Sequence, residues 1–325
     1  MVLESVYEQD FLDCSYGFRP KRSAHDALTA LRDATMAMGG GWIAEVDIER
    51  FFDTIDHGLL RTAIQRRIGD GVILRLIGKW LNAGVVEEGR PTHPETGTPQ
   101  GGVISPILAN IFLHEVLDTW FHAEVLPRLR GPAVLVRYAD DFVIVFKQEN
   151  DARRVMDVLP KRFGKYGLTL HPTKTKLVPF RKPSPPAPPK GGSPGGGSGT
   201  FDLLGFTHYW AQSKSGYWVV MLKTAKDRLT RAAKRFGEWC QKHRHLPVKD
   251  QSRALNWKLR GHDDYFGIVG NLAALWRLRR EIYRRWRHWL NRRSQRARVT
   301  WARMRAIHAR YPLHAPPTEL RHLRA

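Results

Sequence analysis

Residues 133–146 read AVLVRYADDFVIVF, two apolar and β-branched runs that flank the polar pair Asp140-Asp141. This pattern is typical of a β-hairpin whose turn carries both carboxylates. Neighbouring ionised carboxylates repel each other unless a cation compensates them. A turn can also expose two acids to water, and for an isolated Asp-Asp pair this second explanation is the more common one.

Another acidic residue changes that balance. The segment WIAEVD, residues 42–47, has the pattern of a short strand that ends on Asp47. If this strand lies beside the hairpin, Asp47 and Asp140 come together. Carboxylate oxygens of this kind suit Mg²⁺, which takes its other ligands from water and phosphate. Two such ions about 4 Å apart, with Mn²⁺ as a substitute, can stabilise both oxygens of an in-line phosphoryl displacement.

The segments around the hairpin include both helical and strand patterns. We expect the following elements: a helix capped by Asp56 that runs through Leu60 and Ile64, a helix over 72–81, a hairpin or loop over 85–102, a helix capped by Ser105 with Pro106 at its first position and extending to about Val125, a helix over 149–166, and a short strand over 168–171.

Residues 181–200, RKPSPPAPPKGGSPGGGSGT, have a Pro/Gly/Ser-rich composition that cannot pack a core. We interpret them as a flexible insertion at the tip of a hairpin. The flanking strands, 176–180 and 201–210, are then expected to share one sheet.

From Lys223 onward the apolar period becomes helical. Two stripes are expected to form the core of a helix bundle: residues 225, 229, 232, 236 and 239, and residues 275, 278, 282, 286 and 289. Arginines off the second stripe are expected to face outward and bind nucleic acid, because a guanidinium matches phosphate geometry. They are Arg277, Arg279, Arg280, Arg284, Arg285 and Arg287, followed by Arg292, Arg293, Arg296 and Arg298.

The charge of the chain is distributed unevenly. Its formal net charge is +22, and residues 1–220 hold 26 Lys and Arg against 24 Asp and Glu, whereas residues 221–325 hold 27 against 7. A potential this one-sided favours a polyanionic partner such as nucleic acid. Cys14 and Cys240 have no metal-ligand spacing, and no run approaches the roughly 18 apolar residues of a membrane span. We therefore expect a reduced, cytoplasmic, bacterial-type protein with inert thiols and no membrane partner.

Six stretches, in order along residues 16–206, resemble the successive blocks of reverse transcriptases encoded by group II introns. They are YGFRPKRSAHDAL (16–28), DIERFFDTIDH (47–57), GTPQGGVISPILANIFL (97–113), YADD (138–141), GLTLHPTKT (167–175) and LLGF (203–206). Two later stretches, LRGHDDYFGIVGN (259–271) and WLNRRSQRARVTW (289–301), resemble the thumb/maturase domain of the same family.

The resemblance implies a right-hand polymerase fold of the α+β class, in which partial fingers and a palm with an antiparallel sheet occupy residues 1–222 and an all-α thumb/maturase domain occupies 223–325. It implies an RNA-directed DNA polymerase of a mobile element that also assists RNA splicing. The expected partners are template and intron RNA, a DNA primer or target, and deoxynucleoside triphosphates.

Matched positions imply individual roles. Asp47, Asp140 and the carbonyl of Ile48 would bind metal, with Asp141 as a less direct third carboxylate. Phe52 would exclude a ribose 2′-hydroxyl, although a core phenylalanine fits equally well. Gln100 and Gly101 would lie under the incoming nucleotide, and Lys174 would protonate pyrophosphate unless it is simply an exposed lysine. Leu204, Gly205 and Phe206 would form the primer grip.

The chain departs from the family pattern at its start. Family members carry additional N-terminal residues that form much of the fingers, and this sequence begins inside the pattern. We therefore expect a truncated gene, a start codon assigned too late, or half of a split enzyme completed by a separate N-terminal fragment or by a homodimer. The alternatives are a non-catalytic RNA-binding splicing factor that keeps the palm as a scaffold, and a repair- or defence-related reverse transcriptase.

Overall fold

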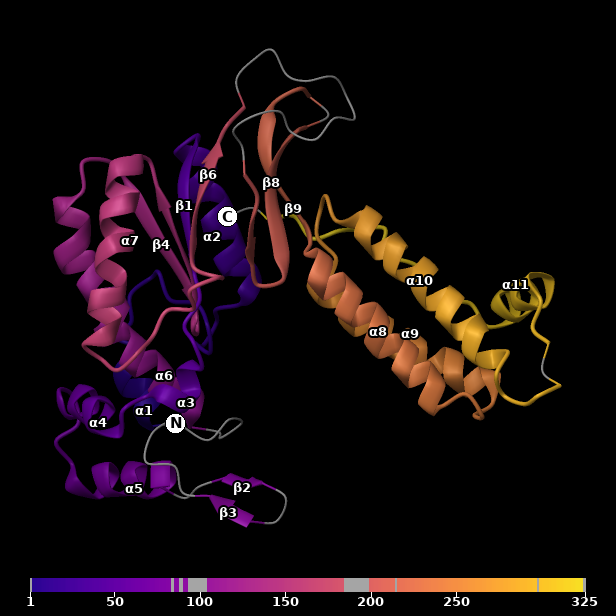
Figure 1. The fold of residues 1–325 in the computed structure, drawn as a ribbon, viewed down its shortest axis with the longest axis horizontal. Helices are drawn as coiled ribbons and strands as arrows, with labels where there is room; N and C mark the ends of the chain where they lie inside the picture. The colour runs from indigo at the N-terminus through magenta and orange to yellow at the C-terminus, as the bar shows by residue number, and fades with distance from the viewer. Residues whose placement is uncertain are drawn as a thin grey trace. The chain divides into compact units, whose positions relative to one another are not determined.

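The computed structural model describes residues 2–82, 85–87, 90–92, 104–183, 199–213, 215–296 and 298–323. The chain divides into two compact units, shown in Figure 1. The first comprises Met1–Leu204 and Tyr209–Val220, and the second comprises Gly205–His208 and Met221–Arg324. Among the described residues, no helix is both long and apolar enough to cross a membrane.

A four-stranded antiparallel sheet, in the order β4-β5-β1-β6, organises the first unit. Its strands are β1 (Gly40–Val46), β4 (Ala133–Tyr138), β5 (Asp141–Phe146) and β6 (Lys176–Arg181). β4 and β5 form the predicted hairpin, in which Tyr138 pairs with Asp141. The predicted strand over 42–47 is also confirmed, and it lies next to the hairpin strand β5.

Both faces of this sheet are covered, because its central strands are apolar on both sides. Phe142, Ile144 and Phe146 of β5 point into one core, whereas Val143 and Val145 point into another. Helices α2 and α7 lie on opposite sides of the sheet (Figure 1). The hydrophobic core on the face that carries α7 (Glu149–Gly164) extends to side chains of further helices, namely α1 (Val2–Tyr7), α3 (Phe51–Thr54), α4 (His57–Gln65), α5 (Gly71–Asn82) and α6 (Ser105–Leu113). The other face packs on α2 (Ala24–Ala37).

The predicted helices α4, α5 and α7 are confirmed, and the Asp56 side chain caps α4 by accepting from the Leu59 backbone N at 2.7 Å. The helix at 105 differs from the prediction. Ser105 is its first helical residue and is buried, while Ile104 occupies the N-cap position.

After Leu113 the helical path continues as two π-helical turns, η1 (His114–Asp118) and η2 (Phe121–Val125), and a 3₁₀ turn, η3 (Leu126–Arg128). A side chain from elsewhere in the unit donates hydrogen bonds to backbone carbonyls of this segment. The Arg162 side chain donates to the carbonyls of Val116 and Glu115 at 2.9 and 3.1 Å. The prediction of helix to about Val125 is therefore correct in extent and wrong in helix type.

The prediction that residues 176–180 and 201–210 share one sheet is wrong. β6 pairs with β1, whereas β7 (Phe201–Leu203), β8 (Phe206–Gln212) and β9 (Trp218–Thr224) form a separate three-stranded sheet. The predicted strand over 168–171 is a single bridge between Ile48 and Leu170. In the 85–102 segment, β2 (Val85–Glu87) and β3 (Arg90–Thr92) form a hairpin. A strand pattern identifies a strand but not its partner, which explains the misassigned sheet.

The second unit is a bundle of α8 (Lys226–Lys242), α9 (Val248–Phe266), α10 (Leu272–Leu290) and α11 (Trp301–Arg310). The predicted stripe of α10 is buried from Leu275 to Trp286. On α8 the buried face is centred one residue further along, on Ala233, Phe236 and Cys240.

Arg279 does not face outward as predicted. Its side chain is buried, forms an ion pair with the buried Asp263, and donates to the His314 carbonyl at 3.1 Å. Both cysteines are free and buried, and burial raises the pKa of the Cys240 thiol to about 12. A raised pKa leaves little of the thiolate, which is the reactive form of cysteine, so we expect this thiol to be inert.

Candidate active site

Acidic residues lie at the same end of the two central strands, β1 and β5, of the four-stranded sheet. We call this end of the sheet the acidic edge. β1 and β5 are antiparallel, with Val46 opposite Phe142. Continuing this register by one residue places Asp47 opposite Asp141, and Asp140 precedes Asp141 in the hairpin turn. Burial raises the pKa of Asp140, and the negative charge of Asp47 raises it further. The two carboxylates therefore act on each other electrostatically.

The backbone of Asp47 is held by the segment that leads into β6. Its carbonyl accepts from the His171 backbone N at 2.8 Å and from the Thr175 hydroxyl at 3.4 Å. The Lys174 ammonium donates to an Asp47 carboxylate oxygen at 2.9 Å, and the lysine side chain is 60% exposed. A solvent-accessible cation thus lies on the acidic edge.

The chemistry of this edge fits a divalent metal ion. The described residues contain no group of three or more His, Cys, Asp or Glu side chains arranged to hold a metal. Asp47 and Asp140 nevertheless provide hard oxygen donors, and their unfavourable proximity is relieved in part by the Lys174 ammonium. Two carboxylates suffice for Mg²⁺ where phosphate and water complete its coordination.

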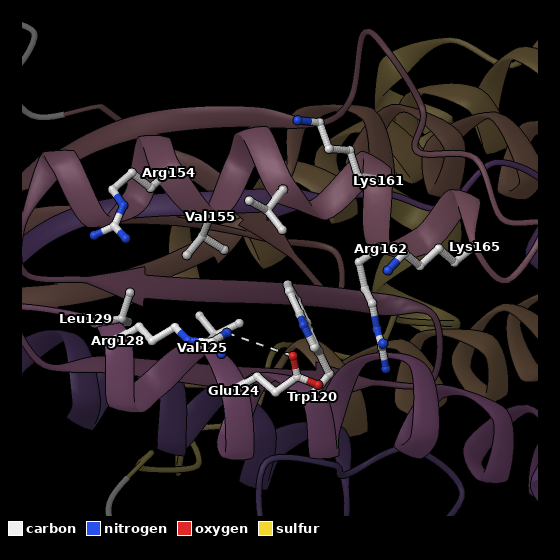
Figure 2. A pocket seen from close by; sticks show the side chains of 11 residues that line it. Trp120, Glu124, Val125, Arg128, Leu129, Arg154, Val155, Lys161, Arg162 and Lys165 are labelled. Carbon is white, nitrogen blue, oxygen red and sulfur yellow. Dashed lines mark ion pairs between the residues drawn. The ribbon is translucent and has the colours of Figure 1, made fainter.

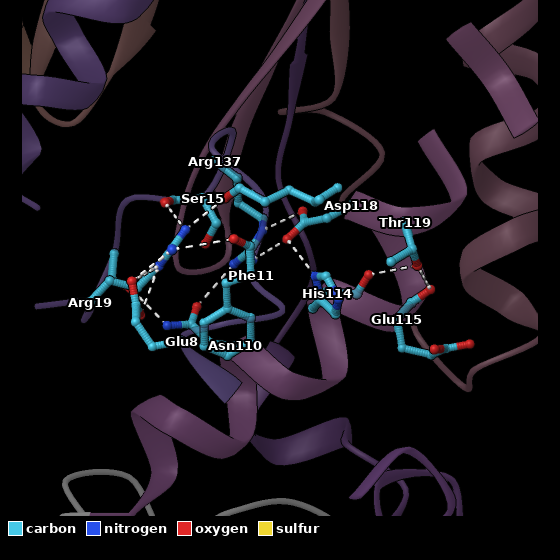
Figure 3. Close-up of polar contacts among 12 residues, drawn as sticks. Glu8, Phe11, Ser15, Arg19, Asn110, His114, Glu115, Asp118, Thr119 and Arg137 are labelled. Atoms are coloured by element: carbon cyan, nitrogen blue, oxygen red, sulfur yellow. Dashed lines mark hydrogen bonds and ion pairs between the residues drawn. The ribbon is translucent and has the colours of Figure 1, made fainter. Parts of the chain in front are cut away.

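A buried arginine supports the turn that carries Asp140. Arg137 is fully buried and forms an ion pair with the equally buried Asp118, with N···O distances of 2.8 and 2.5 Å. The same guanidinium donates to the Asn110 side chain and to the Ala139 carbonyl, both at 3.0 Å. Figure 3 shows Arg137, Asp118 and Asn110 in this network. Ala139, the first turn residue, has a φ of 55°, which is a strained conformation for a non-glycine residue.

Residues 14–17 of the N-terminal segment form hydrogen bonds around the same turn. Arg137 exchanges backbone hydrogen bonds with this segment: its N donates to the Cys14 carbonyl, and its carbonyl accepts from the Tyr16 N, each at 2.8 Å. The Asn110 amide donates to the Gly17 carbonyl at 2.7 Å. These supporting residues were not predicted from the sequence. The available signal was an arginine in the middle of the apolar run 133–138.

Gly17 has no room for a side chain. A Cβ at this position would lie 2.4 Å from the Ala139 backbone N. We expect Gly17→Ala to displace the turn and to lower the free energy of unfolding by about 1–3 kcal/mol, as overpacking does. Gly78→Ala is the control, because nothing lies within 4 Å of that helical glycine. Denaturant unfolding should show the control about 0.5–1 kcal/mol more stable than the wild type; equal stability of Gly17→Ala and wild type would contradict the close contact.

The other predicted polymerase residues occupy varied environments. Ile48 is buried, and Phe52 is partly buried on α3 with its ring edge-on to that of Phe51 at 5.3 Å. Gln100 and Gly101 lie outside the described residues. Leu204 and Gly205 have φ values of 52° and 80° and form the turn between β7 and β8. Phe206 follows and is fully buried.

Apart from Arg279, which is buried, the predicted RNA-binding arginines fall into two groups. Six are exposed: Arg277, Arg280, Arg284, Arg292, Arg296 and Arg298. Three are partly buried: Arg285, Arg287 and Arg293. Arg287 donates to the Val299 carbonyl at 3.0 Å and lies 4.0 Å above the Trp301 ring, and Arg293 donates to the carbonyls of Arg244 and Leu246. The first group presents guanidinium surface to solvent, with Arg284 also paired to Glu281 at 3.1 Å, whereas Arg287 and Arg293 brace the bundle.

Two family models match the chain. Residues 1–208 match the reverse transcriptase (RNA-dependent DNA polymerase) domain, and residues 229–307 match the group II intron, maturase-specific domain. Protein YkfC of Escherichia coli (strain K12) is 37% identical over 175 residues, covering 45% of this chain and 46% of that protein. Group II intron-encoded protein LtrA of Lactococcus lactis subsp. cremoris is 47% identical over 117 residues, covering 36% of this chain and 19% of that protein.

These alignments span less than half the length of either relative. Among solved structures, apo telomerase from Candida Tropicalis matches with a TM-score of 0.51 and 12% identity, over 89% of this chain and 48% of that one. That likeness concerns the fold, and it agrees with the predicted α+β palm joined to a helical domain. Because the reverse transcriptase model covers most of the sequence and the maturase model follows it, this chain belongs to the family of group II intron-encoded reverse transcriptases and maturases.

Proposed function

We propose that the chain is an RNA-directed DNA polymerase that works by two-metal nucleotidyl transfer and also binds intron RNA to assist splicing. The observation that carries the proposal is the juxtaposition of Asp47 and the Asp140-Asp141 turn, at one sheet edge of a matched reverse transcriptase domain. The raised pKa of Asp140 supports it, because perturbed carboxylates concentrate at functional sites.

In this mechanism Asp47, Asp140 and the Ile48 carbonyl would hold Mg²⁺ or Mn²⁺, with Asp141 as the less direct third carboxylate. The metal would supply stabilisation of charge on the attacking and leaving oxygens. The primer 3′-oxygen forms a bond to the α-phosphorus of a deoxynucleoside triphosphate and gives up its proton to water, while the bond to pyrophosphate breaks. Lys174 donates a proton to the departing pyrophosphate; its 60% exposed side chain, held 2.9 Å from Asp47, can follow the leaving group.

The other roles follow from the matched blocks. Gln100 and Gly101 would support the incoming nucleotide, and Leu204, Gly205 and Phe206 would position the primer. The six exposed arginines named above, together with Arg285, Arg287 and Arg293, would contact intron RNA. Binding through phosphates should weaken steeply as salt increases.

Phe52 should select deoxynucleotides through its bulk. It is only partly buried, so part of its ring is available to a nucleotide. We expect Phe52→Ala to raise ribonucleotide incorporation relative to deoxynucleotide incorporation by about 10- to 100-fold, as small changes in pocket volume do. Phe52→Tyr keeps the ring and should behave as wild type. Primer extension with each nucleotide separately measures the ratio; an unchanged ratio in Phe52→Ala would assign this residue to the core.

The proposed function is tested by extending a DNA primer on an RNA template with deoxynucleotides and Mg²⁺. We expect template-directed extension that stops when EDTA is added. Salt-sensitive binding of intron RNA and rescue of splicing, without extension at saturating nucleotide, would instead identify a splicing factor that keeps the palm as a scaffold.

A further inference from the structure

A cavity of about 420 Å³ opens between α7 and the π-helical segment, and none of its lining residues belongs to the candidate active site. Figure 2 shows Arg154, Lys161 and Lys165 projecting from α7, with Trp120 and Glu124 on the opposing segment. The volume is in the range of small-ligand sites in proteins. It exceeds what a single phosphate ion would fill.

The rim of the cavity is strongly basic. Five of its lining residues are cations, namely Arg128, Arg154, Lys161, Arg162 and Lys165, and Glu124 is the one acid. Glu124 lies 3.9 Å from Arg128 and compensates at most that charge. Within the part of the chain that the structure describes, Lys161 and Lys165 have no ion-pair partner. The site therefore favours an anionic ligand.

The walls of the cavity are apolar. Trp120, Val125 and Val155 are buried side chains that form its interior, and Val158 stands at the surface with 45% of its area exposed. An exposed valine next to uncompensated cations offers a ligand both apolar contact and charge. A purely inorganic anion would leave this apolar wall unused.

Arg162 makes the wall rigid. Its hydrogen bonds to the carbonyls of Glu115 and Val116 hold the guanidinium 5.6 Å from the Trp120 ring and 4.8 Å from the Tyr166 ring. The wall opposite α7 includes Glu124 and Val125 of the second π-helical turn, η2. Such turns occur frequently at functional sites.

We propose that this cavity binds an unpaired nucleotide of RNA, with the base against the Trp120, Val155 and Val158 wall and flanking phosphates on Lys161 and Lys165. The inference rests on the proposed RNA-binding function and adds a second contact on the palm unit. Single-stranded RNA combines apolar base faces with a regularly charged backbone, and proteins bind it with this pairing of apolar or aromatic walls and cations. A peptide of Asp and Glu alone would satisfy the rim but has no flat apolar group for the wall.

The first test uses the full chain and single-stranded oligouridine that carries 4-thiouridine and a fluorophore. After irradiation, we expect a crosslink in the peptides that contain Trp120 or Val158. Val158→Glu should reduce that crosslink about tenfold, because it places a carboxylate at the mouth of the cavity. Val72→Glu is the matched control, since Val72 is a 55% exposed helix valine that does not line the cavity.

The second test is the salt dependence of RNA binding by fluorescence anisotropy. Lys161→Gln combined with Lys165→Gln should lower the slope of log affinity against log salt by about 1.4, the value for two phosphate contacts on a single strand. Lys79→Gln combined with Lys182→Gln removes two exposed lysines elsewhere and should leave the slope unchanged.

The outcomes separate this inference from the proposed function. The inference would be overturned if RNA bound but crosslinked only to residues outside the cavity. It would also be overturned if the two double lysine variants had the same salt slope. Either result would leave RNA binding by the chain intact. Absence of RNA binding would overturn both. If polyglutamate but not RNA occupied the cavity, the cavity would be assigned to an acidic peptide instead.

Discussion

Asp140→Asn should lower primer extension by a factor of about 10³ or more, because it removes a carboxylate at the point where metal and transferring phosphate would meet. The substitution conserves shape, so the hairpin turn can keep its geometry. Asp157→Asn is the matched control, an exposed aspartate on α7 away from the acidic edge. Extension rates on one RNA template measure the effect, and a variant that retains more than a tenth of wild-type activity would remove Asp140 from the metal site.

The same substitution, Asp140→Asn, should raise the stability of the folded protein. Burial and the Asp47 charge raise the pKa of Asp140, so the folded protein binds this proton more tightly than the unfolded chain does. At neutral pH the ionised carboxylate therefore costs stability, and in metal-free buffer Asp140→Asn should unfold at higher denaturant than wild type. This advantage should be complete above the folded pKa and should fade as the pH falls towards the ordinary aspartate value. Loss of both activity and stability would indicate a damaged fold instead.

Arg137→Met should lower the free energy of unfolding by about 3–5 kcal/mol, because it leaves the fully buried Asp118 as an unpaired charge. It also removes the donor that holds the Ala139 carbonyl. Replacing both partners, as in Arg137→Met with Asp118→Leu, should recover part of this loss, since no buried charge then remains. Chemical unfolding of the full chain, followed by circular dichroism, measures all three proteins.

Arg153→Met provides the comparison for a surface pair. Arg153 lies 2.6 Å from Glu149, but its side chain is 62% exposed, so its loss should cost at most about 1 kcal/mol. If Arg137→Met cost no more than Arg153→Met, the buried pair would not be a structural support of the turn. A double-mutant cycle on Arg137 and Asp118 would then show little coupling.

Local patterns were sufficient for most elements of the palm. The alternating run 133–146 and the strand 42–47 form adjacent strands, and Asp56 caps its helix. These elements are governed by neighbours in sequence, such as strand periodicity and a side chain that reaches a backbone N three residues away. The sequence blocks likewise identified the family before any coordinates.

Interactions between distant residues escaped the same reasoning. In the π-helical turns, Arg162 donates to carbonyls that lie 46 and 47 residues away in the sequence. Arg279 is buried because Asp263, on the neighbouring helix, requires a buried cation. The sheet that holds β7 and β8 is set by long-range pairing and not by the strand pattern.

By itself the sequence determined the polymerase family, the strand ends that carry Asp47 and Asp140, and the basic helical domain, because each depends on residue type and local spacing. Only the tertiary structure revealed the support of the Asp140 turn by Arg137, Asp118, Asn110 and Gly17. These residues lie far apart in the chain, and burial makes their mutual pairing obligatory. A buried charge needs a partner, and the folded backbone decides which one it finds.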